Sequence, residues 1–269
     1  MNPMLNIAIR AIRVGGKIVA QNYDSKDIRN NLDSLNAIYY LRKIRKRIFS
    51  SIYSVIHQSY PQHSIHDIYS KKKSVIQNNQ WLINSLSGKT NFIKKIPHFC
   101  LSILIKEKNK MYLSVIYDPI KNDLFTAIKG QGAQLNGFRT RCCMHDNNFD
   151  KIIAFYFRHK NQYNTDLYVS LIQQIIQETT SFRHTGCSIL DLAYLSSGKI
   201  NVYIGFNEKL LNINFAELQI RESGALMTDF IGGHNYIKSR IILIGQANTL
   251  KCFLKKTRMV YKEINFPKI

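Results

Sequence analysis

The stretch that decides the fold runs Trp81-Leu-Ile-Asn-Ser-Leu-Ser-Gly-Lys-Thr-Asn-Phe92. A short apolar run ends here in a polar turn that contains Gly88. A strand that leads into such a turn leaves backbone amides unpaired at the start of the next segment. Amides of this kind bind phosphate groups. The sequence therefore predicts a strand followed by an anion-binding turn.

Two long helices are expected before this stretch. Asn2-Pro3 supplies a capping side chain and then proline at the first helical position. Apolar residues follow at helical spacing to about Tyr23, and a second helix is expected from Leu35 to Tyr60. Ser64 to Asn79 is expected to be an exposed segment, so that the sheet would open at Trp81.

The rest of the chain predicts a hairpin followed by alternating strands and helices, which indicates mixed α/β layers. The polar segment Arg139–Asp150 is the candidate boundary between two halves of a single domain spanning 1–269, at about 1–145 and 146–269. The expected elements are strands at Cys100–Lys106, Met111–Tyr117, Leu124–Ile128, Ile152–Phe157, Asn201–Ile204 and Ile241–Ile244, and helices at Asp166–Gln177, Ser188–Ser197, Ile213–Ser223 and Asn248–Glu263.

Composition limits the class of protein. The 269 residues are 45% hydrophobic, which is enough for a sizeable core. No run of about 18 apolar residues occurs, so no membrane span is predicted. The five cysteines are odd in number and lack paired spacing, which argues against a disulfide framework and favours a reducing cytoplasm.

The charge is strongly positive, at a formal +21. Such a balance favours a nucleic-acid partner, and basic residues cluster at Arg42–Arg47 and Lys71–Lys73. The chain is also rich in Lys, Asn and Ile, whose codons are A/T-rich, so mutational drift would raise the charge as well. Both explanations stay open at this point.

Several segments, in order, carry a resemblance to one family. They are Ser59-Tyr-Pro-Gln-His63, Tyr117-Asp-Pro119, Gly130-Gln-Gly-Ala-Gln-Leu-Asn-Gly137, Asp191-Leu-Ala-Tyr194 and Asp229-Phe-Ile-Gly-Gly-His-Asn-Tyr236. Together with Asn84–Phe92 they resemble the inositol monophosphatase family. The resemblance implies an α/β fold, layered as an α/β/α/β/α sandwich, and usually a homodimer. It also implies magnesium-dependent hydrolysis of inositol phosphates.

The N-terminal residues Met1–Arg10 resemble one bacterial branch of that family. That branch additionally acts in ribosomal-RNA transcription antitermination. The resemblance therefore implies NusA, RNA polymerase and nascent RNA as partners.

The metal-binding positions depart from the family pattern. The family's turn D-P-L-D-G-T-T-N-F holds magnesium through both aspartates, and here Asn84 and Ser87 replace them. Leu86 keeps its place, where the family uses a backbone carbonyl. Ile68 and Tyr69 stand where the family has a Glu-Glu pair. If the alignment with the family is shifted by one residue, Asp67 takes one of these two positions.

The later part of the family site is altered too. Asn212 stands for the third aspartate, which opens a helix in the family. A further family glutamate, which contacts inositol hydroxyls, aligns with Gly205, and Glu208 follows three residues later. No catalytic residue is retained.

Among these replacements, four remove a carboxylate from the metal positions, at Ile68, Asn84, Ser87 and Asn212, and Lys89 adds a cation where the family has threonine. Magnesium prefers oxygen ligands and needs their negative charge, so the replacements argue against its binding. Even one lost electrostatic stabiliser commonly costs about two to three orders of magnitude in rate. The sequence therefore predicts little or no phosphatase activity.

The turn at Gly88, Lys89 and Thr90 is still expected to present backbone amides and an ammonium group to an anion. Arg183 stands where the family has a substrate-side arginine, and an ordinary surface cation is the equal alternative. One hypothesis is a protein kept for a scaffold role in transcription after catalysis was lost. Another is a weak phosphatase that binds magnesium through the Leu86 carbonyl, Asn84 and Asn212. A third is a drifting product with no specific role.

Overall fold

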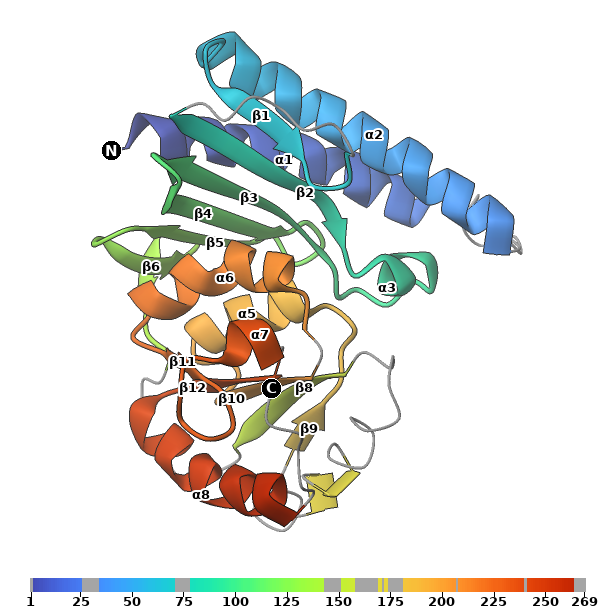
Figure 1. The fold of residues 1–269 in the computed structure, drawn as a ribbon. Helices are drawn as coiled ribbons and strands as arrows, with labels where there is room; N and C mark the ends of the chain where they lie inside the picture. Colours follow the sequence, from blue (N-terminus) through green and yellow to red (C-terminus); the bar gives the residue numbers. More distant parts are fainter. Residues whose placement is uncertain are drawn as a thin grey trace. The chain divides into compact units, whose positions relative to one another are not determined.

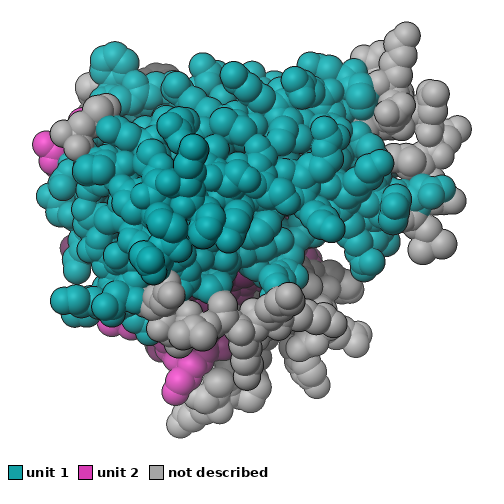
Figure 2. Space-filling model, turned by 90° about the horizontal axis from the view of Figure 1, so that it is seen from above, with its two compact units in different colours: residues 1–138 teal, residues 139–269 magenta. Residues whose placement is uncertain are grey.

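The computed structural model describes residues 2–25, 34–70, 78–142, 151–157, 169–170, 172–173, 181–206, 208–239 and 241–263. The chain divides into two compact units, Met1–Phe138 and Arg139–Ile269 (Figure 2). The division falls at the start of the polar segment Arg139–Asp150. The basic cluster Lys71–Lys73 and nearly all of the expected helix Asp166–Gln177 lie outside the described residues.

Unit 1 begins with the two expected helices, α1 (Pro3–Asp24) and α2 (Ser34–Ser59). The side chain of Asn2 accepts a hydrogen bond from the Leu5 amide at 3.2 Å, which caps α1 as predicted. Apolar residues at helical spacing on both helices are buried together in one core, among them Ile12 and Ile48. Both helix predictions are confirmed.

The helices cover one face of a seven-stranded sheet, with α1 against β3 and β4 and α2 against β1 and β2 (Figure 1). The strand order follows the chain, and β1 and β2 are parallel whereas the pairs from β2 to β6 are antiparallel. The strands are β1 (Ser64–Asp67), β2 (Asn79–Ser87), β3 (Cys100–Glu107), β4 (Lys110–Asp118), β5 (Asp123–Ile128), β6 (Gly132–Leu135) and β7 (Phe138–Thr140).

The expectation of an exposed segment from Ser64 to Asn79 is wrong at its start. Ser64–Asp67 forms β1, which is half-buried and pairs with β2, so Trp81 does not open the sheet. Four residues are too few for a strand period to be recognised in a sequence. Strands β6 and β7 were missed for the same reason, although Asn136-Gly137 makes the tight turn between them, both residues with positive φ.

His63 joins the end of α2 to the sheet. The Trp81 indole donates a hydrogen bond from Nε1 to His63 Nδ1 at 3.0 Å, and the Tyr60 ring stacks on the imidazole at 4.7 Å. Burial lowers the pKa of His63 from its ordinary value of 6.5, against a smaller opposite effect from Glu107. Protonation at Nδ1 would remove the acceptor that Trp81 uses.

We therefore expect stability to fall as the pH drops through 6.5 toward the lower folded-state pKa of His63, because the unfolded chain then binds more protons. His63→Gln keeps an acceptor for Trp81 and does not titrate, so its melting temperature should depend less on pH between 7.5 and 5.5. The exposed His57→Gln is the matched control. Equal pH dependence of the two variants would contradict this account; some dependence remains in both, because burial also lowers the pKa of His66.

Unit 2 contains a five-stranded mixed sheet in the order β11-β12-β10-β8-β9. Helix α8 packs on β12 and α5 on β10, and Figure 1 shows these helices on opposite faces of the sheet. The strands are β8 (Ile152–Phe157), β9 (Ser181–Arg183), β10 (Val202–Phe206), β11 (Leu226–Thr228) and β12 (Ile241–Gly245), and the helices are α5 (Ser188–Ser196), α6 (Leu210–Glu222), α7 (Tyr236–Ser239) and α8 (Ala247–Glu263).

The expected layered α/β class is confirmed by these two units. Most predicted strands and helices match to within one or two residues. Helix α6 instead begins at Leu210, three residues before the expected Ile213, and its preceding residue Lys209 provides no side-chain cap. Without a capping side chain, the sequence carries no signal for that start. No helix among the described ranges is long and apolar enough to cross a membrane.

Candidate functional site

Strand β2, which contains Trp81, ends at Ser87 and leads into the short helix α3 (Lys89–Ile93). Gly88 joins them at φ +79°, and a Cβ there would lie 2.9 Å from both the His98 carbonyl oxygen and the Phe99 Cβ. Only glycine fits such a position without strain. The predicted strand-and-turn is confirmed.

The family's first metal positions lie beside this turn, in unit 1. Asn84 and Leu86 are buried in β2, whereas Ser87 is half-buried. The Tyr69 hydroxyl donates to Asn84 Oδ1 and to the Leu86 carbonyl oxygen, each at 3.2 Å. These are two of the oxygens that the resemblance assigns to magnesium. A neutral phenol therefore makes the contacts expected of the metal.

Two cations flank the same tyrosine. The Arg45 guanidinium carbon lies 3.1 Å from the centroid of the Tyr69 ring, and Lys89 Nζ lies 4.3 Å from it. Burial lowers the pKa of Arg45, while Tyr69 and Asp67 oppose this shift. The cluster of Arg45, Tyr69 and Lys89 places positive charge where the family places carboxylates.

The turn after β1 positions this tyrosine. Asp67 accepts a hydrogen bond from the Tyr69 amide at 3.0 Å, and the Ile68 amide donates to the Ile83 carbonyl oxygen at 3.2 Å. The Asp67 carboxylate thus stabilises the backbone that presents Tyr69.

Asn212 belongs to unit 2, where it lies in the first turn of α6. Its side-chain amide donates to Glu208 Oε1 at 3.0 Å and to Ser188 Oγ at 3.1 Å. Glu208 is 1% exposed and also accepts hydrogen bonds from the Tyr203 hydroxyl and from the Lys209 amide, the latter at 2.9 Å. The position of the third family aspartate is thus an amide that binds a buried carboxylate four residues away.

Two groups of this cluster have raised pKa values. Burial raises the pKa of the Glu208 carboxyl group, although the hydrogen bonds from Tyr203, Asn212, Lys209 and Ser188 act in the opposite direction. Burial and the neighbouring Glu208 also raise the pKa of Tyr203. Several donors converge on the carboxyl group, which is consistent with a structural role.

The remaining predicted phosphate-binding residues are more open. Lys89 is half-buried and Thr90 is exposed at the start of α3. Arg183 is exposed at the end of β9 in unit 2, and its guanidinium donates to the carbonyl oxygen of Phe182 at 2.9 Å. Only Gly88, Lys89 and Thr90 lie together in one unit, because they are consecutive.

The residues at these positions do not fit magnesium. Asn84 Oδ1 and the Leu86 carbonyl oxygen are neutral donors that already bind Tyr69, and Arg45 and Lys89 carry the wrong charge. Within the described part of either unit, no three His, Cys, Asp or Glu side chains come together to hold a metal ion.

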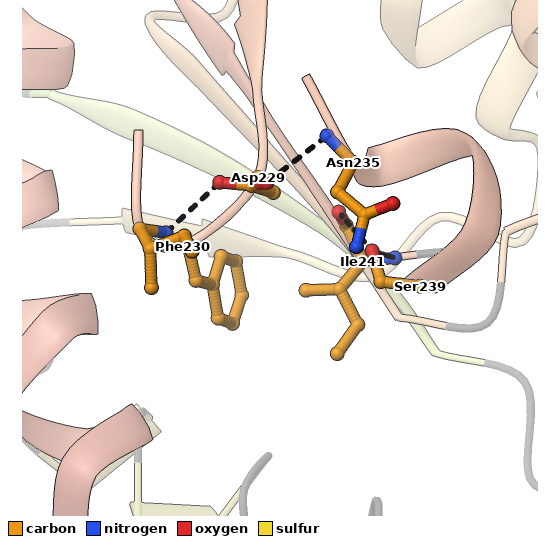
Figure 3. A pocket seen from close by; sticks show the side chains of 6 residues that line it. Asp229, Phe230, Asn235, Ser239 and Ile241 are labelled. Atoms are coloured by element: carbon orange, nitrogen blue, oxygen red, sulfur yellow. Dashed lines mark hydrogen bonds between the residues drawn. The ribbon is translucent and has the colours of Figure 1, made fainter. Parts of the chain in front are cut away.

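A pocket in unit 2 contains one further carboxylate (Figure 3). Asp229 lines it, but its oxygens accept hydrogen bonds from the backbone amides of Ile231, Gly233 and Asn235 at 3.0, 2.7 and 3.1 Å. This carboxylate holds the loop Asp229–Asn235 in shape, so the pocket offers little for catalysis.

Sequence reasoning did not find Arg45 or Tyr203. Arg45 is one of five cations on α2, and nothing in the sequence distinguishes it from its neighbours. Tyr203 lies in an apolar strand where an aromatic residue is ordinary. Glu208 was noted only as following Gly205, and its contact with Asn212 depends on the turn that begins α6.

Comparisons with known proteins identify the family. The model of the inositol monophosphatase family matches residues 1–260. The Nus factor SuhB of Buchnera aphidicola subsp. Schizaphis graminum is 44% identical over 238 residues, covering 86% of this chain and 85% of the relative. The Nus factor SuhB of Escherichia coli K12 is 36% identical over 260 residues, covering 96% and 97%.

Solved structures agree on the fold. The extragenic suppressor protein suhB from Bartonella henselae matches with a TM-score of 0.79 at 23% identity, covering 96% of this chain and all of the other. With the family match over nearly its whole length, the chain belongs to the inositol monophosphatase family.

Proposed function

We propose that this chain is a SuhB-like protein that acts as a Nus factor in ribosomal-RNA transcription antitermination, with its phosphatase activity lost or strongly impaired. The relatives named Nus factor SuhB support the transcription role. The observation that carries the loss of catalysis is the Tyr69 hydroxyl, which binds Asn84 and the Leu86 carbonyl.

The reason is electrostatic. A divalent ion would have to displace the Tyr69 hydroxyl and approach Arg45 and Lys89 with no carboxylate from Ile68, Asn84 or Ser87 to offset the repulsion. Partial desolvation of Arg45 strengthens that repulsion, since charges interact more strongly away from water. The alternative, a weak magnesium-dependent phosphatase, requires this whole cluster to rearrange.

Magnesium should therefore fail to stabilise the protein. A ligand present at about 100 times its Kd stabilises a fold by about 2.7 kcal/mol, which is readily seen in a melting curve. We expect the melting temperature at 10 mM MgCl2 to equal that in NaCl of the same ionic strength. A magnesium-specific increase would favour the phosphatase alternative.

The turn at Gly88, Lys89 and Thr90 in unit 1 is proposed as a residual anion site that needs no metal. Arg183 lies in unit 2 and is kept as a separate candidate phosphate-binding residue. Lys89 supplies the charge, and the turn supplies backbone amides. Calorimetric titration with inositol monophosphate and with inorganic phosphate tests it, with Lys89→Gln as the variant. No heat at millimolar ligand would remove this site from the proposal.

The proposed partners are NusA, RNA polymerase and nascent RNA, and the proposed state is a cytoplasmic homodimer. Two assays on the purified chain decide between the hypotheses: phosphate release from inositol monophosphate with magnesium, and binding to purified NusA. We expect no release above a protein-free control, together with saturable NusA binding. Release would support the phosphatase, and failure of both assays would support a drifting product. Sedimentation equilibrium tests the dimer.

A further inference from the structure

The two-helix layer of unit 1 carries charge of nearly one sign. Helix α2 contains five cations and no acidic residue in 26 positions, and α1 has three cations with Asp24 as its only carboxylate. A solvated helix face usually mixes both signs, often as i,i+4 pairs. Within these two helices, eight cations stand against one carboxylate. The cations are Arg10, Arg13, Lys17, Arg42, Lys43, Arg45, Lys46 and Arg47.

Three of these cations line a groove. The groove is lined on α2 by Lys43, Lys46, Arg47 and Ser50, and on α1 by the apolar side chain of Ile18. All four α2 residues are exposed. Figure 2 views unit 1 from the side on which α1 and α2 lie. The groove therefore presents converging positive charge on an accessible face.

Exposed aromatic rings continue the same stripe of α2 in both directions. Tyr39 precedes Lys43 by four residues and is 71% exposed. Tyr53 follows Ser50 by three residues, is 37% exposed, and stacks on the His57 ring at 5.2 Å and 18°. Residues three or four apart share one face of a helix. The fourteen helical steps from Tyr39 to Tyr53 span roughly 21 Å.

We propose that this face, made of Tyr39, Lys43, Lys46, Arg47 and Tyr53 and here termed the α2 basic stripe, binds single-stranded RNA. Cations that neutralise phosphates, interleaved with rings on which bases stack, are the two components that single-strand binding requires. The choice of RNA over DNA rests on the proposed transcription role; the binding itself rests on charge and stacking alone.

Other occupants fit the stripe less well. A helix that lies on a membrane needs an outward apolar face, whereas the apolar residues Ile44, Ile48 and Ile52 of α2 are buried in the core. An acidic protein would match the charge, but the centre of the stripe is made of cations, whereas the centre of a protein interface is poor in charged residues, lysine above all. Duplex nucleic acid keeps its bases paired, so the rings would have nothing to stack on.

The test is fluorescence anisotropy with a labelled single-stranded RNA of about 12 nucleotides, which lies within the usual range of site sizes. We expect Lys43→Gln/Lys46→Gln/Arg47→Gln to weaken binding about tenfold or more and to reduce the salt slope by about two, as expected for three lost phosphate contacts. Tyr39→Ala and Tyr53→Ala should each weaken binding about fivefold with little change in salt slope.

The matched control is Lys94→Gln/Lys110→Gln/Lys129→Gln, which removes the same charge from exposed positions of unit 1 outside the stripe. An equal loss in this control, or no binding by the wild type at about 50 mM salt, would overturn the proposal. Equal binding of single-stranded DNA would overturn the assignment to RNA. Tighter binding of a duplex, or of anionic phospholipid vesicles, would assign the stripe to that occupant instead.

NusA binding separates this inference from the proposed function. If the stripe serves RNA alone, its variants should bind NusA as the wild type does. If RNA binding is absent while NusA binding persists, only the inference fails. If RNA binding depends on the stripe while NusA binding is absent, the stripe stands and the proposed Nus-factor role fails.

Discussion

Restoring carboxylates at the four family positions is expected to leave hydrolysis of inositol monophosphate at background. The quadruple variant Ile68→Glu, Asn84→Asp, Ser87→Asp, Asn212→Asp still has the Tyr69 hydroxyl against the Leu86 carbonyl. It also keeps Lys89 and Arg45 beside that ring. In unit 1, the carboxylates restored at Ile68, Asn84 and Ser87 would pair with these cations rather than with magnesium.

Adding Tyr69→Glu and Lys89→Thr to the quadruple variant should allow magnesium to bind, because it removes the phenol hydroxyl and the lysine cation. The family has glutamate and threonine at these places, so the six-site variant recreates the ligand pattern. We expect magnesium-dependent phosphate release at least about 100-fold above the quadruple variant, since single electrostatic stabilisers are worth that much. The measurement is initial rate against magnesium concentration.

The control is Tyr69→Glu/Lys89→Thr alone, which lacks the other ligands and should stay inactive. Melting curves of all variants with and without magnesium separate misfolding from a missing site. If the quadruple variant hydrolysed the substrate as fast as the six-site variant, magnesium would displace the Tyr69 hydroxyl at little cost in free energy. That result would remove the electrostatic argument against catalysis.

Removing the buried carboxyl group of Glu208 in unit 2 should have the largest effect on stability. Glu208→Ala leaves the Tyr203 hydroxyl and the Asn212 amide without their acceptor in a buried site. An unsatisfied buried polar group costs about 1–3 kcal/mol. With both the hydroxyl and the amide unsatisfied, we expect the free energy of unfolding to fall by about 3 kcal/mol or more. Urea unfolding at pH 7 measures it.

Glu208→Gln is the matched variant, because it keeps the shape and one acceptor oxygen. Burial raises the pKa of Glu208 above its ordinary value of 4.5, so the folded state binds the proton more tightly than the unfolded state. Its contribution to stability is therefore greatest at low pH and is lost as the pH rises toward the folded-state pKa. The Gln variant should lose less stability than the wild type over that rise. A Gln variant as unstable as the Ala variant would contradict the proposed network.

The sequence alone determined those features of the fold that depend on a few neighbouring residues. Asn2 and Pro3 start α1, Gly88 turns β2 into α3, and Asn136-Gly137 turns β6 into β7, because capping, proline and positive φ act over a few residues. Order and spacing of motifs also identified the family, and the loss of carboxylates at Asn84, Ser87 and Asn212 is visible in the sequence alone.

What occupies those positions was decided by the tertiary structure. Tyr69 reaches Asn84 and the Leu86 carbonyl because β1 pairs with β2, and β1 itself carries too short a pattern to be predicted. Arg45 meets the same ring from α2, 24 positions earlier in the chain. Glu208 meets Tyr203 because the chain turns back between β10 and α6. Contacts between residues distant in the sequence depend on how whole elements pack, whereas sequence periodicity reports only which face of each element is apolar.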